Sequence, residues 1–161
     1  MTTPIYPFVG LVGTGAMGRG IAQIAAQGGC QVLLFDAQSG AADTARTAVQ
    51  EQWQRLQAKG RISEEQLQAW SARLQPVTEM AALKDCTLVV EAIVERLDVK
   101  QAVFAQLEAV VAPDAVLVSN TSSLSVTQIA ASLQRPERLA GLHFFNPVPL
   151  MKVVEVIAGL K

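Results

Sequence analysis

The chain is poor in the residues that crosslink proteins or bind metal ions. Its 161 residues include only two cysteines and a single histidine. Cys30 and Cys86 each stand at the start of an apolar run, without CxxC spacing and without a histidine nearby. Buried thiols are therefore expected at both positions, rather than a disulfide, a nucleophile or a metal site. The sequence predicts no bound metal ion.

An excess of charge and long apolar runs are also missing. With 13 basic and 14 acidic residues the net charge is −1, which leaves no electrostatic footprint for nucleic acid or for an anionic membrane. No apolar run reaches about 18 residues, and no cleavable signal pattern is visible. We expect a soluble, cytoplasmic protein without nucleic-acid or membrane partners. Half of the residues are apolar, so the chain can bury the core of one domain covering residues 1–161.

Short apolar runs alternate with helical patterns, which is typical of βαβ crossovers and a parallel sheet. Strands are predicted at residues 9–12, 31–35, 88–92, 115–118, 139–144 and 153–157. After the second strand, two helices separated by Gly60 form a predicted hairpin at about residues 41–74, the second helix opening with a capping box at Ser63. Asp98 is predicted to cap a later helix. The fold class predicted is α/β: a Rossmann-type, doubly wound, mostly parallel sheet with an inserted helical hairpin.

The strongest local signal is the segment Gly13-Thr14-Gly15-Ala16-Met17-Gly18, which follows the first predicted strand and opens a helix. Gly13 is expected to make a tight turn, Gly15 to let the backbone approach a pyrophosphate, and Gly18 to let the helix pack closely on the strand. The N-terminus of the helix offers free N–H groups and a partial positive charge to phosphates. These six residues are therefore predicted to bind a dinucleotide.

Asp36 supplies the second half of this signal. It ends the second predicted strand, twenty-one positions after Gly15, where a carboxylate accepts hydrogen bonds from a ribose 2′-hydroxyl. A carboxylate at this place repels a 2′-phosphate, so NAD is favoured over NADP. A glycine-rich turn with a surface aspartate is the plain structural alternative.

The one histidine, His143, lies in a predicted strand, twelve positions before Glu155 in another. If the last two strands pair as a hairpin the two side chains can face each other, although spacing alone does not set the register. Imidazole exchanges protons near neutral pH, and a carboxylate bound to its second nitrogen fixes the tautomer. A lone histidine also serves structural roles, so at this point the pair is a candidate for proton transfer.

Four motifs together resemble the 3-hydroxyacyl-CoA dehydrogenase family, in particular its bacterial 3-hydroxybutyryl-CoA and 3-hydroxyadipyl-CoA branch. They are the glycine turn with Asp36, the segment VVEAIVE at 89–95, SNTSS at 119–123, and HFFNP at 143–147 followed by Glu155. The match spans essentially the whole chain. The resemblance implies NAD-dependent oxidation of (S)-3-hydroxyacyl-CoA to 3-oxoacyl-CoA, in fatty-acid β-oxidation or in phenylacetate-type degradation of aromatic acids.

The resemblance also implies roles for single residues. His143 would be the general base that removes the hydroxyl proton, Glu155 its hydrogen-bond partner, and Ser122 the side chain that holds the substrate oxygen beside the cofactor. The nicotinamide and ribose side of the cofactor would be lined by Glu95, Lys100, Ser122 and Asn146. The residue types alone would make Glu95 a loop charge and Lys100 a solvated helix residue.

Lys59 matches a family lysine that contacts the CoA moiety of the substrate, as Ser122 contacts its reacting end. Arg55 lies four positions earlier, so both would share one helix face, which is equally typical of a solvated surface. Gln52 stands where some members carry a CoA-contacting serine, which leaves the details of CoA binding open.

The helical C-terminal domain of the family is absent from this chain, which ends at Lys161. In the family that domain closes the cleft and carries much of the dimer interface. We therefore expect a fragment of a longer enzyme, weakly active by itself, whose full-length form is a homo-oligomer.

Two other functions fit parts of the pattern. The β-hydroxyacid dehydrogenases also use a GxGxMG-like turn, but there a lysine is expected to carry the acid–base chemistry, and the segment at 143–147 argues against them. A non-catalytic NAD-binding protein on the same fold is the second alternative, since a fold does not determine a function. His143, Glu155 and Ser122 argue against it, and kinetic measurements decide.

Overall fold

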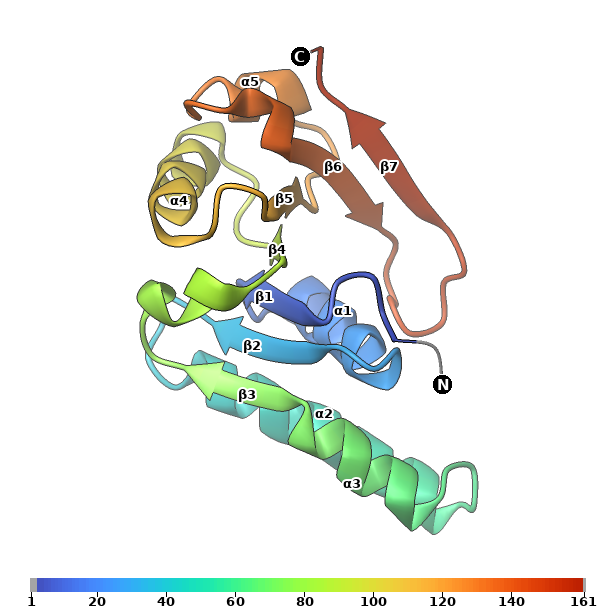
Figure 1. Cartoon of the computed structure of the whole chain (residues 1–161). Coiled ribbons are helices and arrows are strands. Elements are labelled where there is room, and N and C mark those ends of the chain that lie inside the picture. Colours follow the sequence, from blue (N-terminus) through green and yellow to red (C-terminus); the bar gives the residue numbers. More distant parts are fainter. Residues whose placement is uncertain (1–2, 161) are drawn as a thin grey trace.

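In the computed structural model, which describes residues 3–160, a seven-stranded sheet carries helices on both faces (Figure 1). The strands are β1 (Phe8–Val12), β2 (Gln31–Phe35), β3 (Leu74–Val77), β4 (Leu88–Glu91), β5 (Val116–Ser119), β6 (Leu139–Phe144) and β7 (Val154–Ala158). The helices are α1 (Ala16–Gln27), α2 (Ala41–Ala58), α3 (Glu64–Ala72), α4 (Leu97–Val110) and α5 (Val126–Ala130), with short 3₁₀ segments at Met80–Asp85 and Pro136–Arg138. None of these helices is long and apolar enough to cross a membrane.

The strand order is β3-β2-β1-β4-β5-β6-β7, and every neighbouring pair is parallel except β6 with β7. Strand β1 pairs with β2 on one side and with β4 on the other, so the chain winds outward in both directions from β1. This is the predicted doubly wound, mostly parallel sheet. In such sheets ligands bind where the winding reverses, outside the carboxyl ends of the central strands.

Each face of the sheet has its own apolar core. On one face α1, α2 and α3 pack against β1, β2 and β3, with Trp53 of α2 completely buried beside Trp70 of α3. On the other face α4 and α5 pack against β4, β5 and β6 around Phe104 and Leu117, which are also completely buried. Figure 1 shows α4 and α5 grouped beside β4 to β6, and α2 with α3 lying along β3.

The helical hairpin is confirmed as two helices, and one strand was not predicted. The second helix ends at Ala72, and Leu74 opens this additional strand, β3, which pairs with β2. The hairpin therefore stands in the crossover that leads from β2 to β3. Pro76 obscures this strand in the sequence, since proline has no N–H for a ladder, but β3 lies at an edge of the sheet, where proline is tolerated.

Two of the five helices within residues 3–160, α3 and α5, start with a side-chain cap. Ser63 accepts a hydrogen bond from the backbone N–H of Gln66, whose side chain returns one to Ser63, which is the predicted capping box. Asp98, predicted as a cap, is instead inside α4, which begins at Leu97 after Arg96. Its carboxylate pairs with the Arg96 guanidinium. An acidic residue in the first turn also interacts favourably with the positive end of the helix dipole.

Both cysteine thiols are free. Cys86 is buried as expected, whereas Cys30 is only partly buried. Burial, with a smaller contribution from Asp85, raises the pKa of the Cys86 thiol to about 11. Neither thiol is therefore primed as a nucleophile by this environment.

Candidate functional site

The glycine turn between β1 and α1 has three glycines with three different surroundings. Gly13 has a φ of +93°, which disfavours other residues, and a Cβ there would lie 2.6 Å from the carbonyl oxygen of Ala92. A Cβ on Gly18 would lie 1.9 Å from the carbonyl oxygen of Gly13, so the helix can pack here only without a side chain. A Cβ on Gly15 would meet nothing within 4 Å. The backbone at Gly15 therefore faces open space, as close approach of a ligand requires.

Asp36 is tied directly to this turn. One of its carboxylate oxygens accepts hydrogen bonds from the backbone N–H and the hydroxyl of Thr14, both at 2.8 Å, and the other accepts the N–H of Gln38. Partial burial raises the pKa of Asp36, but these hydrogen bonds outweigh burial and leave it below its ordinary value. The carboxylate is thus held ionised at the end of β2, facing the turn.

A cavity of about 500 Å³ extends from the glycine turn past Asp36. It is lined by Val12, Gly13, Thr14, Gly15, Phe35, Asp36, Ala37, Gln38, Met80, Ala92, Ile93, Val94, Val99, Val103 and Gln106. Its walls are mostly apolar, with polar groups limited to the turn, Asp36 and two glutamines. Such a cavity accommodates a flat apolar ring and offers a carboxylate at one end for hydroxyl groups.

A second cavity, of about 350 Å³, lies next to the first and shares Ala92 and Ile93 with it. It is lined by Met17, Ala92, Ile93, Glu95, Asn120, Ser122, His143, Phe144, Phe145 and Asn146. These residues come from the start of α1, from the segments that follow β4 and β5, and from the end of β6 and the residues after it. The predicted catalytic residues His143 and Ser122 and the predicted cofactor residues Met17, Glu95 and Asn146 thus meet in one place.

His143 and Glu155 are brought together by the hairpin of β6 and β7. The antiparallel register sets the two residues directly opposite each other, and the Nδ1 atom of His143 lies 2.8 Å from a carboxylate oxygen of Glu155. The condition stated for this contact, that the last two strands pair as a hairpin, is met, and β7 begins one residue later than expected. A carboxylate can only accept a hydrogen bond, so Nδ1 carries the proton and Nε2 of the neutral ring keeps its lone pair.

Glu95 binds three successive residues of the loop that follows β5. One oxygen of its carboxylate accepts hydrogen bonds from the hydroxyl of Thr121 and from the backbone N–H groups of Ser122 and Ser123, the latter two at 3.0 and 3.2 Å. Burial raises the pKa of Glu95, but these hydrogen bonds and the charge of Lys100 outweigh it and lower the pKa to about 2. Ser122 is therefore placed at the cavity by its backbone, and its hydroxyl is not the group that ties it to Glu95.

This pKa predicts a specific acid sensitivity. A carboxyl group whose pKa falls on folding contributes stability that is present above its unfolded value, about 4.5, and is lost as the pH falls toward its folded value, about 2. The free energy of unfolding should therefore drop across this window, and Glu95→Gln should flatten the drop. Urea unfolding at a series of pH values measures both, and parallel curves for the two proteins would contradict the prediction.

Lys100 corrects an expectation based on residue type. Its side chain is 1% exposed, so it is not a solvated helix residue. The ammonium lies 2.5 Å from a carboxylate oxygen of Glu91, which is completely buried, and 3.3 Å from one of Glu95. It lines neither cavity. The structure places Lys100 behind Glu95, so its predicted contact with the cofactor remains a prediction.

Lys59 is a second predicted site residue that the structure does not bring to these cavities. It is exposed at the C-terminal end of α2, at the turn of the helical hairpin, and lines neither cavity. Its contact with CoA remains a prediction. Asn146 does reach the second cavity, where it precedes a cis peptide bond to Pro147.

Polar residues at the ends of β4 and β5 were not assigned a role from the sequence. Glu91 and Ser119 end these strands, both completely buried, and the Ser119 hydroxyl donates to Glu91 at 2.6 Å. Asn120 accepts the backbone N–H of Phe144, which joins β6 to the same cluster. The signal available in the sequence was their position, because polar residues directly after buried strands point to the ligand-binding edge of a parallel sheet.

Comparison with known proteins agrees with this geometry. A family model described as "3-hydroxyacyl-CoA dehydrogenase, NAD binding domain" matches residues 8–161. The 3-hydroxyadipyl-CoA dehydrogenase of Escherichia coli K12 is 47% identical over 152 residues, which are 94% of this chain and 32% of that protein. The 3-hydroxybutyryl-CoA dehydrogenase of Bradyrhizobium diazoefficiens is 40% identical over 152 residues, or 52% of its length.

Solved structures give the same result. A crystal structure of 3-hydroxybutyryl-CoA dehydrogenase from Escherichia coli K12 superposes with a TM-score of 0.94 at 46% identity, covering 98% of this chain and 33% of that one. The (S)-3-hydroxybutyryl-CoA dehydrogenase of Ralstonia eutropha superposes with a TM-score of 0.92 at 38% identity, covering 96% and 55%. The chain therefore spans about a third to a half of the length of these relatives.

Proposed function

The chain belongs to the 3-hydroxyacyl-CoA dehydrogenase family, and from this premise we propose that the complete protein containing it oxidises (S)-3-hydroxyacyl-CoA to 3-oxoacyl-CoA with NAD. The observation that carries the proposal is the position of the His143–Glu155 pair. His143, held by Glu155, lines the same cavity as Ser122, and that cavity adjoins the one at the glycine turn. An acid–base group thus lies beside the cofactor site, where oxidation of an alcohol needs it.

The residues present fit NAD. Open space at Gly15 accommodates the pyrophosphate, and the cavity of about 500 Å³ leads from there to Asp36, which can accept the ribose hydroxyls. The second cavity is the place left for the nicotinamide and for the reacting end of the substrate, with Glu95, Ser122 and Asn146 around it. NAD, when bound, supplies the ring that accepts the hydride from C3 of the substrate.

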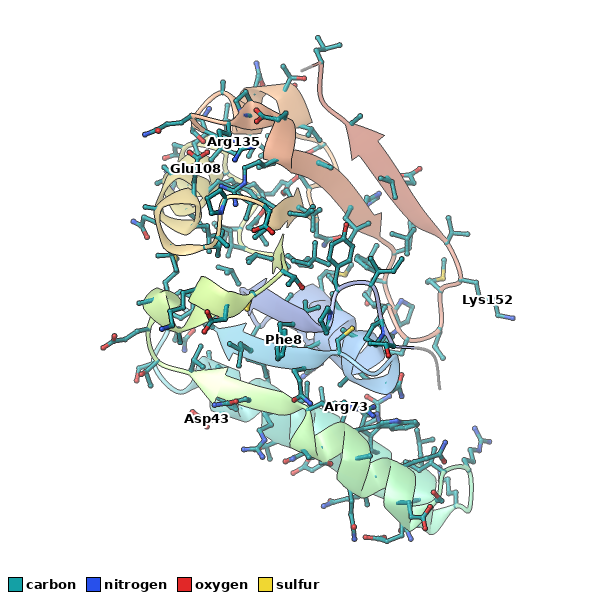
Figure 2. All side chains as sticks on the ribbon, in the orientation of Figure 1. Phe8, Asp43, Arg73, Glu108, Arg135 and Lys152 are labelled. Carbon is teal, nitrogen blue, oxygen red and sulfur yellow. The ribbon has the colours of Figure 1, made fainter. Side chains whose placement is uncertain are left out.

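Asp36 should determine the affinity and the choice of cofactor. Loss of a hydrogen bond to a charged group costs about 1.5–3 kcal/mol, so Asp36→Ala should weaken NADH binding by roughly 10- to 100-fold. The same change removes repulsion of a 2′-phosphate, so the preference for NADH over NADPH should narrow. Fluorescence titration with both nucleotides measures this, with Asp43→Ala, an exposed carboxylate on α2, as control (Figure 2). An unchanged preference in Asp36→Ala would contradict the assignment.

His143 acts as the general base in this proposal. With Nδ1 bound to Glu155, its Nε2 atom accepts the proton of the 3-hydroxyl group as hydride leaves C3, which gives the 3-oxo product and an imidazolium ring. The carboxylate of Glu155 then stabilises the positive charge on that ring. Ser122, on the loop held by Glu95, donates its hydroxyl to the substrate oxygen and fixes its distance from His143.

The names of the relatives bear on the acyl group of the substrate. The curated Escherichia coli protein is named for 3-hydroxyadipyl-CoA and the Escherichia coli crystal structure for 3-hydroxybutyryl-CoA, at 47% and 46% identity. We propose a short acyl-CoA substrate, in fatty-acid or aromatic-acid degradation, with CoA bound along the face of α2 that carries Lys59. We also propose that the complete protein is cytoplasmic and homo-oligomeric.

The test is formation of NADH when the complete protein is mixed with NAD and a panel of (S)-3-hydroxyacyl-CoA substrates. Turnover with at least one of them, at a rate far above that of this chain alone, is expected, because positioning and water exclusion by the remaining part of such enzymes contribute strongly. Tight NADH binding without turnover on any acyl chain would instead favour a non-catalytic NAD-binding protein.

A further inference from the structure

We propose that Glu91 is a positioning residue of the site: through the buried ammonium of Lys100 it fixes Glu95, and thereby the loop that carries Ser122. The catalytic meaning of this inference rests on the proposed function, but the physical linkage does not. It concerns two buried ionic groups that take no part in proton or hydride transfer. The chain of contacts runs from the end of β4, through α4, to the loop after β5.

The first step is the burial of Lys100. A lysine that is 1% exposed remains charged only if its ammonium is fully paired, because an uncompensated buried charge is very costly. Glu91 supplies that partner at 2.5 Å. Glu91 is itself held by the Ser119 hydroxyl at 2.6 Å and by the backbone N–H of Ile93 at 2.9 Å. Its carboxylate is therefore fixed by three separate contacts, with Lys100 of α4, with Ser119 of β5 and with Ile93 after β4.

The second step is that the Lys100 ammonium has two carboxylates beside it, those of Glu91 and Glu95. Glu91 neutralises Lys100, and a second carboxylate, Glu95, approaches the same ammonium at 3.3 Å. Glu95 is 37% exposed at the side chain and follows β4 in an irregular segment, so its own backbone does not fix it. The ammonium, immobilised by Glu91, is the rigid point to which the Glu95 carboxylate is attached.

The third step is the loop itself. The other oxygen of Glu95 accepts the Thr121 hydroxyl and the backbone N–H groups of Ser122 and Ser123. Thr121 is buried, whereas Ser122 and Ser123 are exposed, so no apolar packing of their side chains holds them. The position of Ser122 in the cavity therefore depends on where Glu95 is held, and that depends on Glu91 and Lys100.

A double variant with uncharged side chains at both positions separates the effect on the loop from an effect on the stability of the whole fold. Glu91→Gln with Lys100→Met removes both buried charges at nearly constant volume, and such replacements of buried ion pairs often preserve or raise stability. We expect the double variant to keep its unfolding midpoint while the amide hydrogens of Ser122 and Ser123 exchange at least tenfold faster, as measured by NMR without ligands. NADH binding should weaken in parallel. Exchange at both amides within twofold of the wild type, in a folded double variant, would overturn the proposal.

A matched control exists on α4. Glu108 also accepts two backbone N–H groups, those of Gln134 and Arg135, but on a loop that does not line the cavity, and Figure 2 shows Glu108 and Arg135 next to each other. Glu108→Gln should speed exchange at Gln134 and Arg135 and leave Ser122 and Ser123 unchanged. If it loosens both loops equally, the effect is general softening and the proposal fails.

A conservative variant decides the case if the double variant does not fold. Glu91→Asp keeps the charge but withdraws the carboxylate from the ammonium by one methylene. It should speed exchange at Ser122 and Ser123 at least threefold, and unchanged exchange would overturn the proposal. Amide exchange is measured without substrate, so the two proposals can fail separately. If exchange is faster in the variants but the complete wild-type protein has no dehydrogenase activity, only the proposed function is refuted. If the wild-type protein is active but exchange is unchanged in the variants, only the linkage is refuted.

Discussion

Replacing His143 by alanine in the complete protein should lower kcat by about 10²–10⁴-fold, because a positioned general base contributes that much to the rate. The affinity for NADH should stay within a few-fold of the wild type, since the proposed cofactor contacts lie on the glycine turn, Asp36 and the loops after β4, β5 and β6, and do not include His143. The rate of NADH formation and a fluorescence titration measure the two quantities. Added imidazole should restore part of the lost rate by replacing the missing base.

Glu155→Gln separates the role of the base from that of its partner. A carboxamide oxygen can still accept the proton on Nδ1 of His143, so the ring orientation is retained, but the charge that stabilises the imidazolium is lost. A decrease of about 10- to 100-fold is expected, as for other residues that orient a functional histidine. If His143→Ala retains more than a tenth of the wild-type kcat, the assignment of His143 as the base is wrong.

Alanine at Gly18 should affect stability and alanine at Gly15 should affect binding, although the two glycines are only three positions apart. A Cβ on Gly18 would lie 1.9 Å from a backbone oxygen that cannot move without disturbing the turn. We expect Gly18→Ala to lower the free energy of unfolding by about 3 kcal/mol, the upper range for overpacking, and the melting temperature by roughly 6–12 °C. Calorimetry or urea unfolding measures this loss.

Gly15→Ala should leave the fold nearly intact. Its φ of −64° suits alanine and a Cβ there meets nothing, so only the small cost of a less favourable N-cap is expected, about 1 kcal/mol or less. The methyl group would occupy the space where a pyrophosphate must approach, so the Kd for NADH should rise at least tenfold. Equal affinity in Gly15→Ala and wild type would show that the dinucleotide does not bind over this turn.

The parts of the fold that could be predicted from the sequence are those governed by local patterns. Apolar runs identified the parallel strands, and the capping box at Ser63 identified the start of α3. Strand β3 was missed because its four residues contain Pro76, and only its place at the edge of the sheet makes that residue acceptable. Local capping rules also misplaced the start of α4, which begins at Leu97, so that Asp98 lies inside the helix and pairs with Arg96.

Part of the site could be predicted from the sequence, as part of the fold could. The glycine turn and Asp36 stand at characteristic spacing, whereas the register that places Glu155 opposite His143 comes from the pairing of β6 with β7, which spacing alone does not set. Residue type alone misjudged Lys100, because burial depends on what α4 packs against, and the carboxylates that offset its charge come from a different segment. Such networks join residues distant in sequence, and no periodic pattern records them.

The exposure of strand β7 predicts the order of events during thermal unfolding. Its five residues are all exposed, it pairs within residues 3–160 only with β6, and it carries Glu155, half of the proposed acid–base pair. Segments with little buried surface open locally at a lower free energy than the core. Unless another part of the complete protein covers it, this strand should separate before the parallel sheet melts. Thermal inactivation would then precede loss of secondary structure, and reversibly so, since cooling lets one edge strand pair again.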